Sequence, residues 1–175
     1  MDKLTIEHLA AYLPYDIKCQ YIFYDDGEKS NPIVSKIESI YKDCVTFVNG
    51  SCDYYFEDDY ECEIKLLLRP LFDLTTEIEH NGEKFVPIVE LIKIKYKKWY
   101  DEKKGSRYAD IDFELNTNYV KAHFSFMATL CIEIWLRDIS HEEYWVVQKL
   151  LSWHFDIYNL IPQKLAIDIK EVNND

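Results

Sequence analysis

The sequence predicts an α+β fold, with a small antiparallel sheet or partly open barrel in the N-terminal half, then helices, further strands and a long amphipathic C-terminal helix. Residues 15–68 are rich in β-branched and aromatic side chains broken by turn signals, which is typical of short strands. Residues 140–158 instead have a helical periodicity. The length of 175 residues suits one compact unit or two tightly packed subdomains, a β-rich part (1–80) and an α+β part (81–175).

The β-rich part is expected to begin with a short helix. Thr5 is a suitable cap for it, and Pro14 ends it because the residue before a proline disfavours helical geometry. Strands are expected at residues 17–24, 33–41, 44–48 and 62–68. Lys42-Asp43 separates the second from the third and predicts a hairpin there. Pro70 suits the first turn of a further helix.

The α+β part is expected to alternate helices with strands. Pro87 opens a helical stretch, and alternation predicts strands at 110–115 and 130–137, with another favoured at 119–128. Ser140 and Glu143 have the spacing of a capping box. Apolar residues then recur at three- and four-residue steps as far as Tyr158, which predicts the long C-terminal helix. After Pro162, residues 165–169 either add a final strand or simply pack down.

The net charge restricts the classes of partner. Acidic residues outnumber basic ones by 32 to 20, which gives −12. This charge repels phosphates and anionic lipid, so it disfavours sequence-independent DNA binding and membrane binding. No apolar run approaches the roughly 20 residues that span a bilayer. The first residues lack the features of an export signal, and the five cysteines are scattered, so the expected location is the cytoplasm.

One candidate binding segment, residues 53–63, combines acidic and aromatic side chains. Its six acids are Asp53, Glu57, Asp58, Asp59, Glu61 and Glu63. The binding residues selected from it are Tyr54, Tyr55, Asp58, Asp59 and Tyr60. Closely spaced carboxylates can imitate phosphate charge toward a nucleic-acid-binding protein or can hold a cation, although the spacing is not that of a calcium loop. A solvated surface loop is the simpler interpretation.

A second candidate segment, residues 93–107, is basic and aromatic. It holds seven bases against two acids, and its selected binding residues are Lys97, Lys98, Trp99 and Tyr100. This mixture is typical of surfaces that bind single-stranded nucleic acid. It also fits an acidic protein partner, and the simpler interpretation is the solvated end of a helix with its following loop.

Sequence motifs for nucleotide, metal and hydrolase sites are absent. The chain has no G-x-G-x-x-G, P-loop, G-x-S-x-G, C-x-x-C or H-E-x-x-H pattern. His154 and Asp156 do not suit a base-and-orienter pair, since residues two apart on a helix point about 200° apart. His154 is therefore expected to be a satisfied core or boundary histidine. No catalytic residue, metal ligand or cofactor is predicted.

Three functions remain open. The leading hypothesis is non-enzymatic binding of a protein partner. The alternative is a nucleic-acid-associated regulator that uses residues 93–107. A small enzyme whose site assembles from dispersed residues such as His80 and His154 is the third.

Several segments resemble a family of hypothetical proteins encoded by phages and prophages of gut and related Gram-negative bacteria. They are Tyr12-Leu13-Pro14-Tyr15, Leu67-Leu68-Arg69-Pro70-Leu71, residues 77–88, Trp153-His154-Phe155-Asp156 and residues 165–169. The resemblance implies a mobile-element setting inside a bacterial cell, with an accessory or host-modulating role. It assigns no activity and no functional residue.

Overall fold

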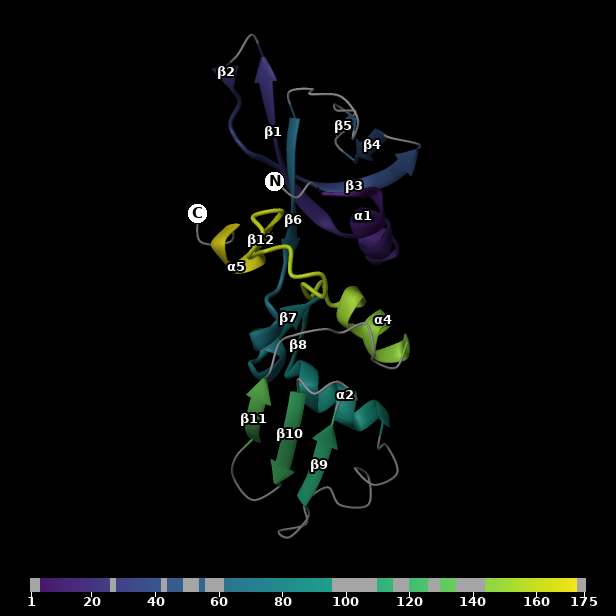
Figure 1. Cartoon of the computed structure of the whole chain (residues 1–175), viewed down its shortest axis with the longest axis vertical. Helices are drawn as coiled ribbons and strands as arrows, with labels where there is room; N and C mark the ends of the chain where they lie inside the picture. Colours follow the sequence, from purple (N-terminus) through teal and green to yellow (C-terminus); the bar gives the residue numbers. More distant parts are fainter. Residues whose placement is uncertain are drawn as a thin grey trace. The chain divides into compact units, whose positions relative to one another are not determined.

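A computed structural model describes residues 4–25, 28–41, 44–48, 54–55, 62–95, 110–114, 120–125, 130–134 and 144–172 (Figure 1). The chain divides into two compact units. Unit 1 consists of Met1–Pro70 together with Leu150–Asp175, and unit 2 consists of Leu71–Lys149. Both ends of the chain therefore belong to unit 1, and unit 2 is an insertion in its sequence. The sequence instead predicts a division at residue 80 into two consecutive parts, and the units of the structure do not have this boundary.

Unit 1 is a mixed α+β structure built on one sheet, which has seven strands among the described residues. They are β1 (Lys18–Asp25), β2 (Glu28–Lys29), β3 (Ile33–Tyr41), β4 (Cys44–Phe47), β5 (Tyr54–Tyr55), β6 (Cys62–Leu68) and β12 (Ala166–Asp168). Their order is β12-β6-β1-β3-β4-β5, with β2 paired to β1 (Figure 1). All pairs are antiparallel except β12 with β6, which is parallel. The sheet is confirmed, and it is not closed into a barrel.

Alternation of side chains along the strands separates a core face of this sheet from an open face. Ile17, Cys19 and Tyr21 are buried at alternate positions, whereas Lys18, between Ile17 and Cys19, is exposed. On the core face the ring of Tyr21 stacks on that of Phe47, with centroids 4.4 Å apart. The helix α1 (Ile6–Tyr12) follows the cap residue Thr5 and ends before Pro14, which lies in the 3-10 turn η1 (Leu13–Tyr15). The expected first helix is thus confirmed.

In its described residues, unit 2 contains two small antiparallel sheets, the helix α2 and the first part of the helix α4 (Tyr144–Ser152). Its elements are the 3-10 turn η2 (Leu71–Thr75), β7 (Ile78–His80), β8 (Glu83–Phe85), α2 (Pro87–Lys95), β9 (Asp110–Glu114), β10 (Val120–Ser125) and β11 (Leu130–Ile134). Asn81 and Gly82 join β7 to β8 with positive φ values of 52° and 82°, which is the geometry of a tight hairpin turn. The order β11-β10-β9 confirms strands where residues 110–137 alternate.

The long C-terminal helix is the part of the fold prediction that was wrong. Helix α4 covers Tyr144–Ser152 and does not continue to Tyr158. His154 adopts a left-handed φ of 63°, its N–H donates to Leu151 O (2.9 Å), and the N–H of Phe155 donates to Leu150 O (2.9 Å). This pair of bonds is a Schellman cap, which turns the chain out of the helix. The predicted capping box, Ser140 and Glu143, lies outside the described residues.

After the cap, the C-terminal segment pairs with the sheet of unit 1. Phe155 forms a parallel bridge with Arg69, which directly follows β6. Further along, β12 pairs with β6 itself and is followed by the short helix α5 (Ile169–Val172). Residues 165–169 were expected to add a strand or to pack down, and they add a strand. Pairing with β6 is available only to an extended chain, so tertiary structure overrides the helical periodicity.

Candidate functional site

The structure places two of the nine predicted binding residues. Tyr54 and Tyr55 form β5, the last strand of the sheet of unit 1 in the part of the chain that is described. The other seven lie outside the described residues: Asp58, Asp59, Tyr60, Lys97, Lys98, Trp99 and Tyr100. One end of residues 53–63 is therefore fixed at a sheet edge, where a strand has backbone groups that can pair with another chain.

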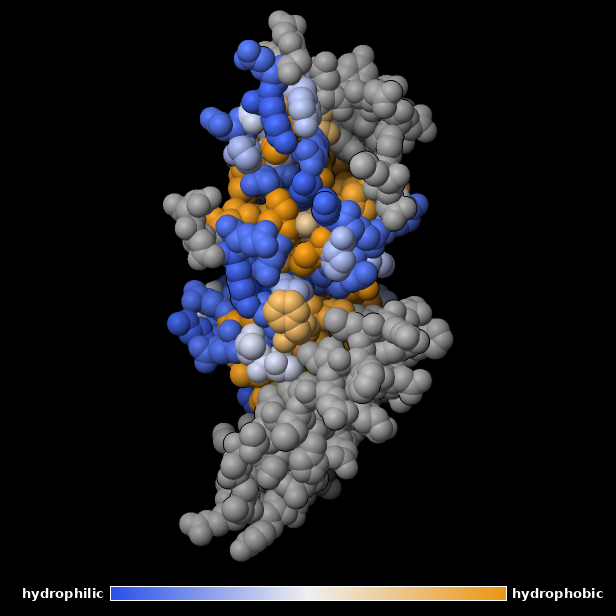
Figure 2. Space-filling view, turned by 60° about the vertical axis from the view of Figure 1, so that its left-hand side comes forward, coloured by the Kyte–Doolittle hydropathy of each residue, from blue (hydrophilic) through white to orange (hydrophobic). Residues whose placement is uncertain are grey.

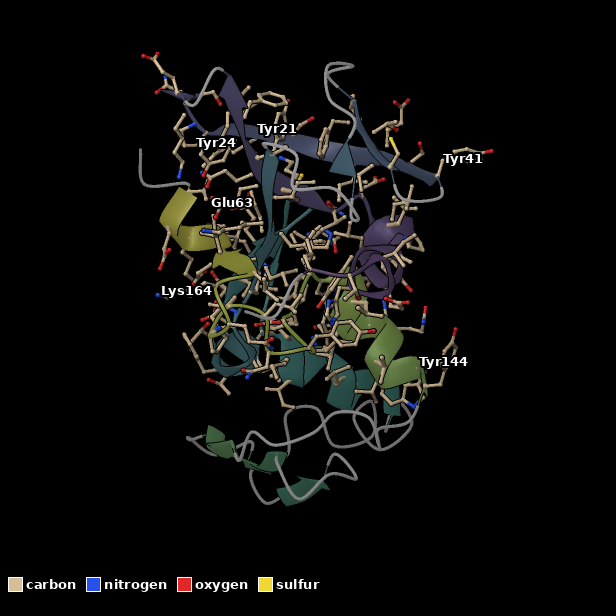
Figure 3. The ribbon with its side chains drawn as sticks, turned by 45° about the horizontal axis from the view of Figure 1, so that its top comes forward. Tyr21, Tyr24, Tyr41, Glu63, Tyr144 and Lys164 are labelled. Carbon is tan, nitrogen blue, oxygen red and sulfur yellow. The ribbon has the colours of Figure 1, made fainter. Side chains whose placement is uncertain are left out.

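The strand register groups the tyrosines of this edge. Tyr55 is opposite Cys44 of β4, and Cys44 is opposite Tyr41 at the end of β3. Tyr41 is 68% exposed, and Figure 3 shows it directed outward from the end of its strand. In the next row Tyr54 is opposite Val45, which is fully buried. We call Tyr41, Cys44, Tyr54 and Tyr55 the hairpin end: four residues that strand pairing groups at one end of the sheet, with Tyr41 exposed and the neighbouring Val45 buried.

One acid and one base of the two charged segments form ion pairs within the fold. Glu63 lies in β6, where its carboxylate contacts Lys65 Nζ at 2.7 Å and Lys29 Nζ at 3.8 Å. The hydrogen bond from Lys65 is the main reason that the pKa of Glu63 is lowered. In α2, Lys93 donates to the carboxylate of Glu90 three residues earlier. Glu63 and Lys93 thus stabilise a strand and a helix and are less available to a partner.

Sequence reasoning missed a buried polar network that joins both ends of the chain in unit 1. Tyr12 is fully buried; its hydroxyl donates to Phe155 O at 2.7 Å and accepts from the N–H of Ile157 at 3.3 Å. Burial is the main cause that raises the pKa of Tyr12. The backbone of Arg69 adds two bonds, because its N–H donates to His154 O and its carbonyl accepts from Asp156. Three segments that lie far apart in the sequence, around Tyr12, Arg69 and Phe155, meet here.

Asp156 organises the loop that follows. Its two carboxylate oxygens accept hydrogen bonds from the N–H groups of Leu160 (2.7 Å) and Ile161 (2.8 Å). These bonds replace water around a charged residue that is only 4% exposed. Burial raises its pKa, and these backbone donors oppose the rise. A carboxylate held by two backbone donors acts as a cap for the loop. This role differs from that of an orienter for His154. The helical geometry used in the sequence analysis of this pair does not apply, because α4 ends at Ser152.

His154 is a boundary histidine, as expected, and is engaged with the other end of the chain. Its Nε2 donates to Tyr15 O at 2.6 Å. Burial lowers the pKa of His154 below the ordinary value of 6.5, the bond to Tyr15 opposes this, and the nearby charge of Arg69 adds to the lowering. A left-handed conformation costs a residue with a Cβ about 1 kcal/mol or more, so this geometry persists because the surrounding contacts impose it.

We expect the folded protein to become less stable in mild acid because of His154. Because folding lowers its pKa, the unfolded state binds the proton more readily, and the free energy of unfolding should fall as the pH drops below about 6.5. Asp156 opposes this at lower pH, since its raised pKa makes the folded state retain a proton. Urea unfolding of the wild type and of His154→Asn between about pH 8 and 5 isolates the histidine, because asparagine tolerates the left-handed conformation. Equal pH dependence in both proteins would contradict the assignment.

The described residues include the buried thiol of Cys19. Burial raises the pKa of the Cys19 thiol to about 12, and a thiol that stays protonated is a poor nucleophile. Within the described ranges, no three His, Cys, Asp or Glu side chains are grouped so that they could hold a metal ion. No helix in those ranges has the length and apolar character needed to cross a membrane.

Comparison with known proteins found no match to any family model, curated protein sequence or solved structure. The candidate site is therefore defined by its own geometry.

Proposed function

We propose that this chain is a phage- or prophage-associated protein that acts without catalysis, by binding a protein partner through the hairpin end and the acidic segment that continues from it. The observation that supports the proposal most strongly is that Tyr41 of β3 and Tyr55 of β5 are both paired with Cys44 of β4. This pairing brings an exposed tyrosine and the tyrosine pair Tyr54–Tyr55 to one end of the sheet. Tyrosine is enriched at the centres of protein interfaces, where its ring is buried and its hydroxyl finds a partner.

The position of β5 suggests how a partner binds. An edge strand can accept a further strand from another chain, with main-chain hydrogen bonds supplying affinity and side-chain pockets supplying specificity. The edge is short, since β5 has two residues, and so a partner needs contacts beyond it. The acids that follow β5 in the sequence supply these contacts by attracting a basic surface.

The setting follows from the resemblance in the sequence. A mobile element that enters a bacterial cell gains from small proteins that bind host factors. A partner whose basic surface normally contacts nucleic acid fits the closely spaced carboxylates of residues 57–61, because these imitate phosphate charge. We therefore expect an accessory or host-modulating factor in the host cytoplasm.

Replacing Tyr41 by alanine should weaken capture of this partner while leaving the fold intact. The side chain is largely exposed, so its loss costs little stability, whereas a tyrosine that is important at an interface contributes more than about 1 kcal/mol to binding, or more than roughly fivefold in affinity. The measurement is a pull-down from lysogenic or infected cells, followed by titration calorimetry with the partner that is recovered. Binding should also weaken as salt is raised, because the acids contribute to it.

Tyr144→Ala is the matched control, since Tyr144 is 77% exposed but belongs to α4 (Figure 3). A photo-crosslinking residue placed at position 41 should react with the partner, and the same residue at position 144 should not. If both alanine variants retain the partner equally, the hairpin end is not the binding surface and the proposal fails.

A further inference from the structure

The open face of the sheet in unit 1 carries a group of lysines. The positions of β1 that alternate with buried Cys19 and Tyr21 are Lys18, Gln20, Ile22 and Tyr24; Lys18 is exposed, Gln20 and Tyr24 are half-buried, and Ile22 between them is buried. The register places Lys36 of β3 opposite Lys18, Lys65 of β6 opposite Gln20 and Lys29 of β2 opposite Tyr24. We call Lys18, Lys29, Lys36 and Lys65 the lysine face. In Figure 2 the region around β1 and β2 is mostly hydrophilic.

Grouping these lysines on one face does not favour the stability of the sheet. Lys18 and Lys36 are direct cross-strand partners, and like charges at such positions destabilise a sheet. The concentration of bases is also contrary to the composition, because the chain as a whole has a net charge of −12. A positive face within a negative molecule selects for anionic ligands at short range.

Two carboxylates contact the lysine face, but they leave it positive. Asp16 pairs with Lys36, and Glu63 pairs with Lys65 and Lys29. Among the described residues Lys18 has no ion-pair partner, and its side chain is exposed. The Asp16 side chain is 76% exposed, and exposed ion pairs are worth at most about 1 kcal/mol. A phosphate can therefore replace Asp16 as the counter-ion of Lys36 at little cost.

An aromatic ring lies at one end of the same face. Tyr24 is half-buried, and Lys29 Nζ lies 5.8 Å from the centre of its ring. Figure 3 shows Tyr24 and Glu63 on the neighbouring strands β1 and β6. A sheet face that combines cations with an aromatic ring is a recurrent platform for single-stranded nucleic acid, because the lysines meet phosphates and the ring stacks on a base.

We propose that the lysine face binds single-stranded nucleic acid, with Lys18 and Lys36 contacting the phosphate backbone and Tyr24 stacking on a base. The surface differs from the hairpin end, and the inference does not depend on the proposed function. An acidic peptide meets the same charges but gains nothing specific from stacking, which is why nucleic acid is favoured as the occupant.

The test is fluorescence anisotropy of a labelled oligothymidylate with the full chain, from low salt upward. Wild-type protein should bind, and Lys18→Glu with Lys36→Glu should weaken binding and reduce the salt slope by about 1.4, since each lost phosphate contact to a single strand removes about 0.7. Lys18→Gln tests the same contact without a new charge, in case the double variant does not fold. Lys84→Gln, at an exposed lysine of β8, is the charge-matched control for Lys18→Gln and should bind as the wild type does.

Three results would overturn the inference. One is no binding of the oligonucleotide at low salt. Another is equal weakening by the Lys84 control, which would indicate a response to net charge alone. The third is an oligoglutamate peptide of the same charge binding as tightly as the oligonucleotide, which would assign the face to acidic protein segments. Loss of affinity in Tyr24→Ala for the oligonucleotide but not for the peptide would support stacking.

Discussion

Replacing Phe155 by alanine is expected to lower the free energy of unfolding by about 3–5 kcal/mol, because the phenylalanine ring is fully buried and its removal leaves a cavity. Phe155 also pairs with Arg69 after β6, so the loss falls where the C-terminal segment joins the rest of unit 1. Urea unfolding followed by circular dichroism measures the change. Limited proteolysis of the folded variant should also cut residues 153–165 faster than in the wild type.

Phe72→Ala is the control for this prediction. Phe72 is 57% exposed, and surface substitutions of this kind usually change stability by no more than about 0.5 kcal/mol. If the two variants lose similar stability, Phe155 does not have the structural role assigned to it.

Replacing Tyr12 by phenylalanine is expected to cost about 1–3 kcal/mol, although it removes a single oxygen atom. That oxygen donates to Phe155 O and accepts from Ile157, so the variant leaves a buried carbonyl and a backbone N–H without this partner. The ring itself remains, so hydrophobic burial is unchanged and the difference reports the hydrogen bonds. The readout is again chemical denaturation, at neutral pH.

Tyr144→Phe removes the same atom from a side chain that is 77% exposed and should be neutral. A double variant of Tyr12→Phe with Asp156→Asn tests whether the two groups act together on the loop. The two changes should not be additive, because both loosen the same turn. Strict additivity would show that the Tyr12 hydroxyl and the Asp156 carboxylate stabilise it independently.

Local sequence signals predicted most elements of the fold. Strand β6 falls at the predicted residues, the break at 42–43 lies between β3 and β4, and Pro87 opens α2. Each of these depends on neighbouring residues only: alternation, turn chemistry, or the fixed φ of proline. The strand order was not predictable in this way. β12 pairs with β6 across about a hundred residues of sequence, and no periodic pattern encodes such a partner.

The end of α4 shows where local reasoning failed. Leu151, His154, Phe155 and Tyr158 recur at helical spacing, yet His154 is left-handed and Phe155 is bridged to Arg69. Glycine usually marks such a cap, and histidine gives no comparable signal. Tyr12 was missed for a related reason, since the bonds of its hydroxyl to Phe155 and Ile157 join distant parts of the chain. Asp156 was missed because it was placed on the helix, whereas it caps the loop that follows.

The candidate binding residues show the same division between local and long-range information. The choice of Tyr54 and Tyr55 rested on composition, and the register with Tyr41 is a property of the folded sheet. The lysine face was invisible in sequence, because Lys18, Lys36 and Lys65 are far apart along the chain and come together only through strand pairing. The net charge of the whole chain does not show such a group, because it sums all charges without regard to their positions in the fold.

The interrupted sequence of unit 1 has a consequence for biosynthesis. Translation proceeds from the N-terminus, so β12 is synthesised about a hundred residues after its partner strand β6. Residues 71–149, which form unit 2, are synthesised between the two strands and can fold while one edge of β6 still lacks β12. A nascent chain stalled before Ala166 would expose that edge of β6 to chaperones, and synthesis of β12 would allow it to be covered.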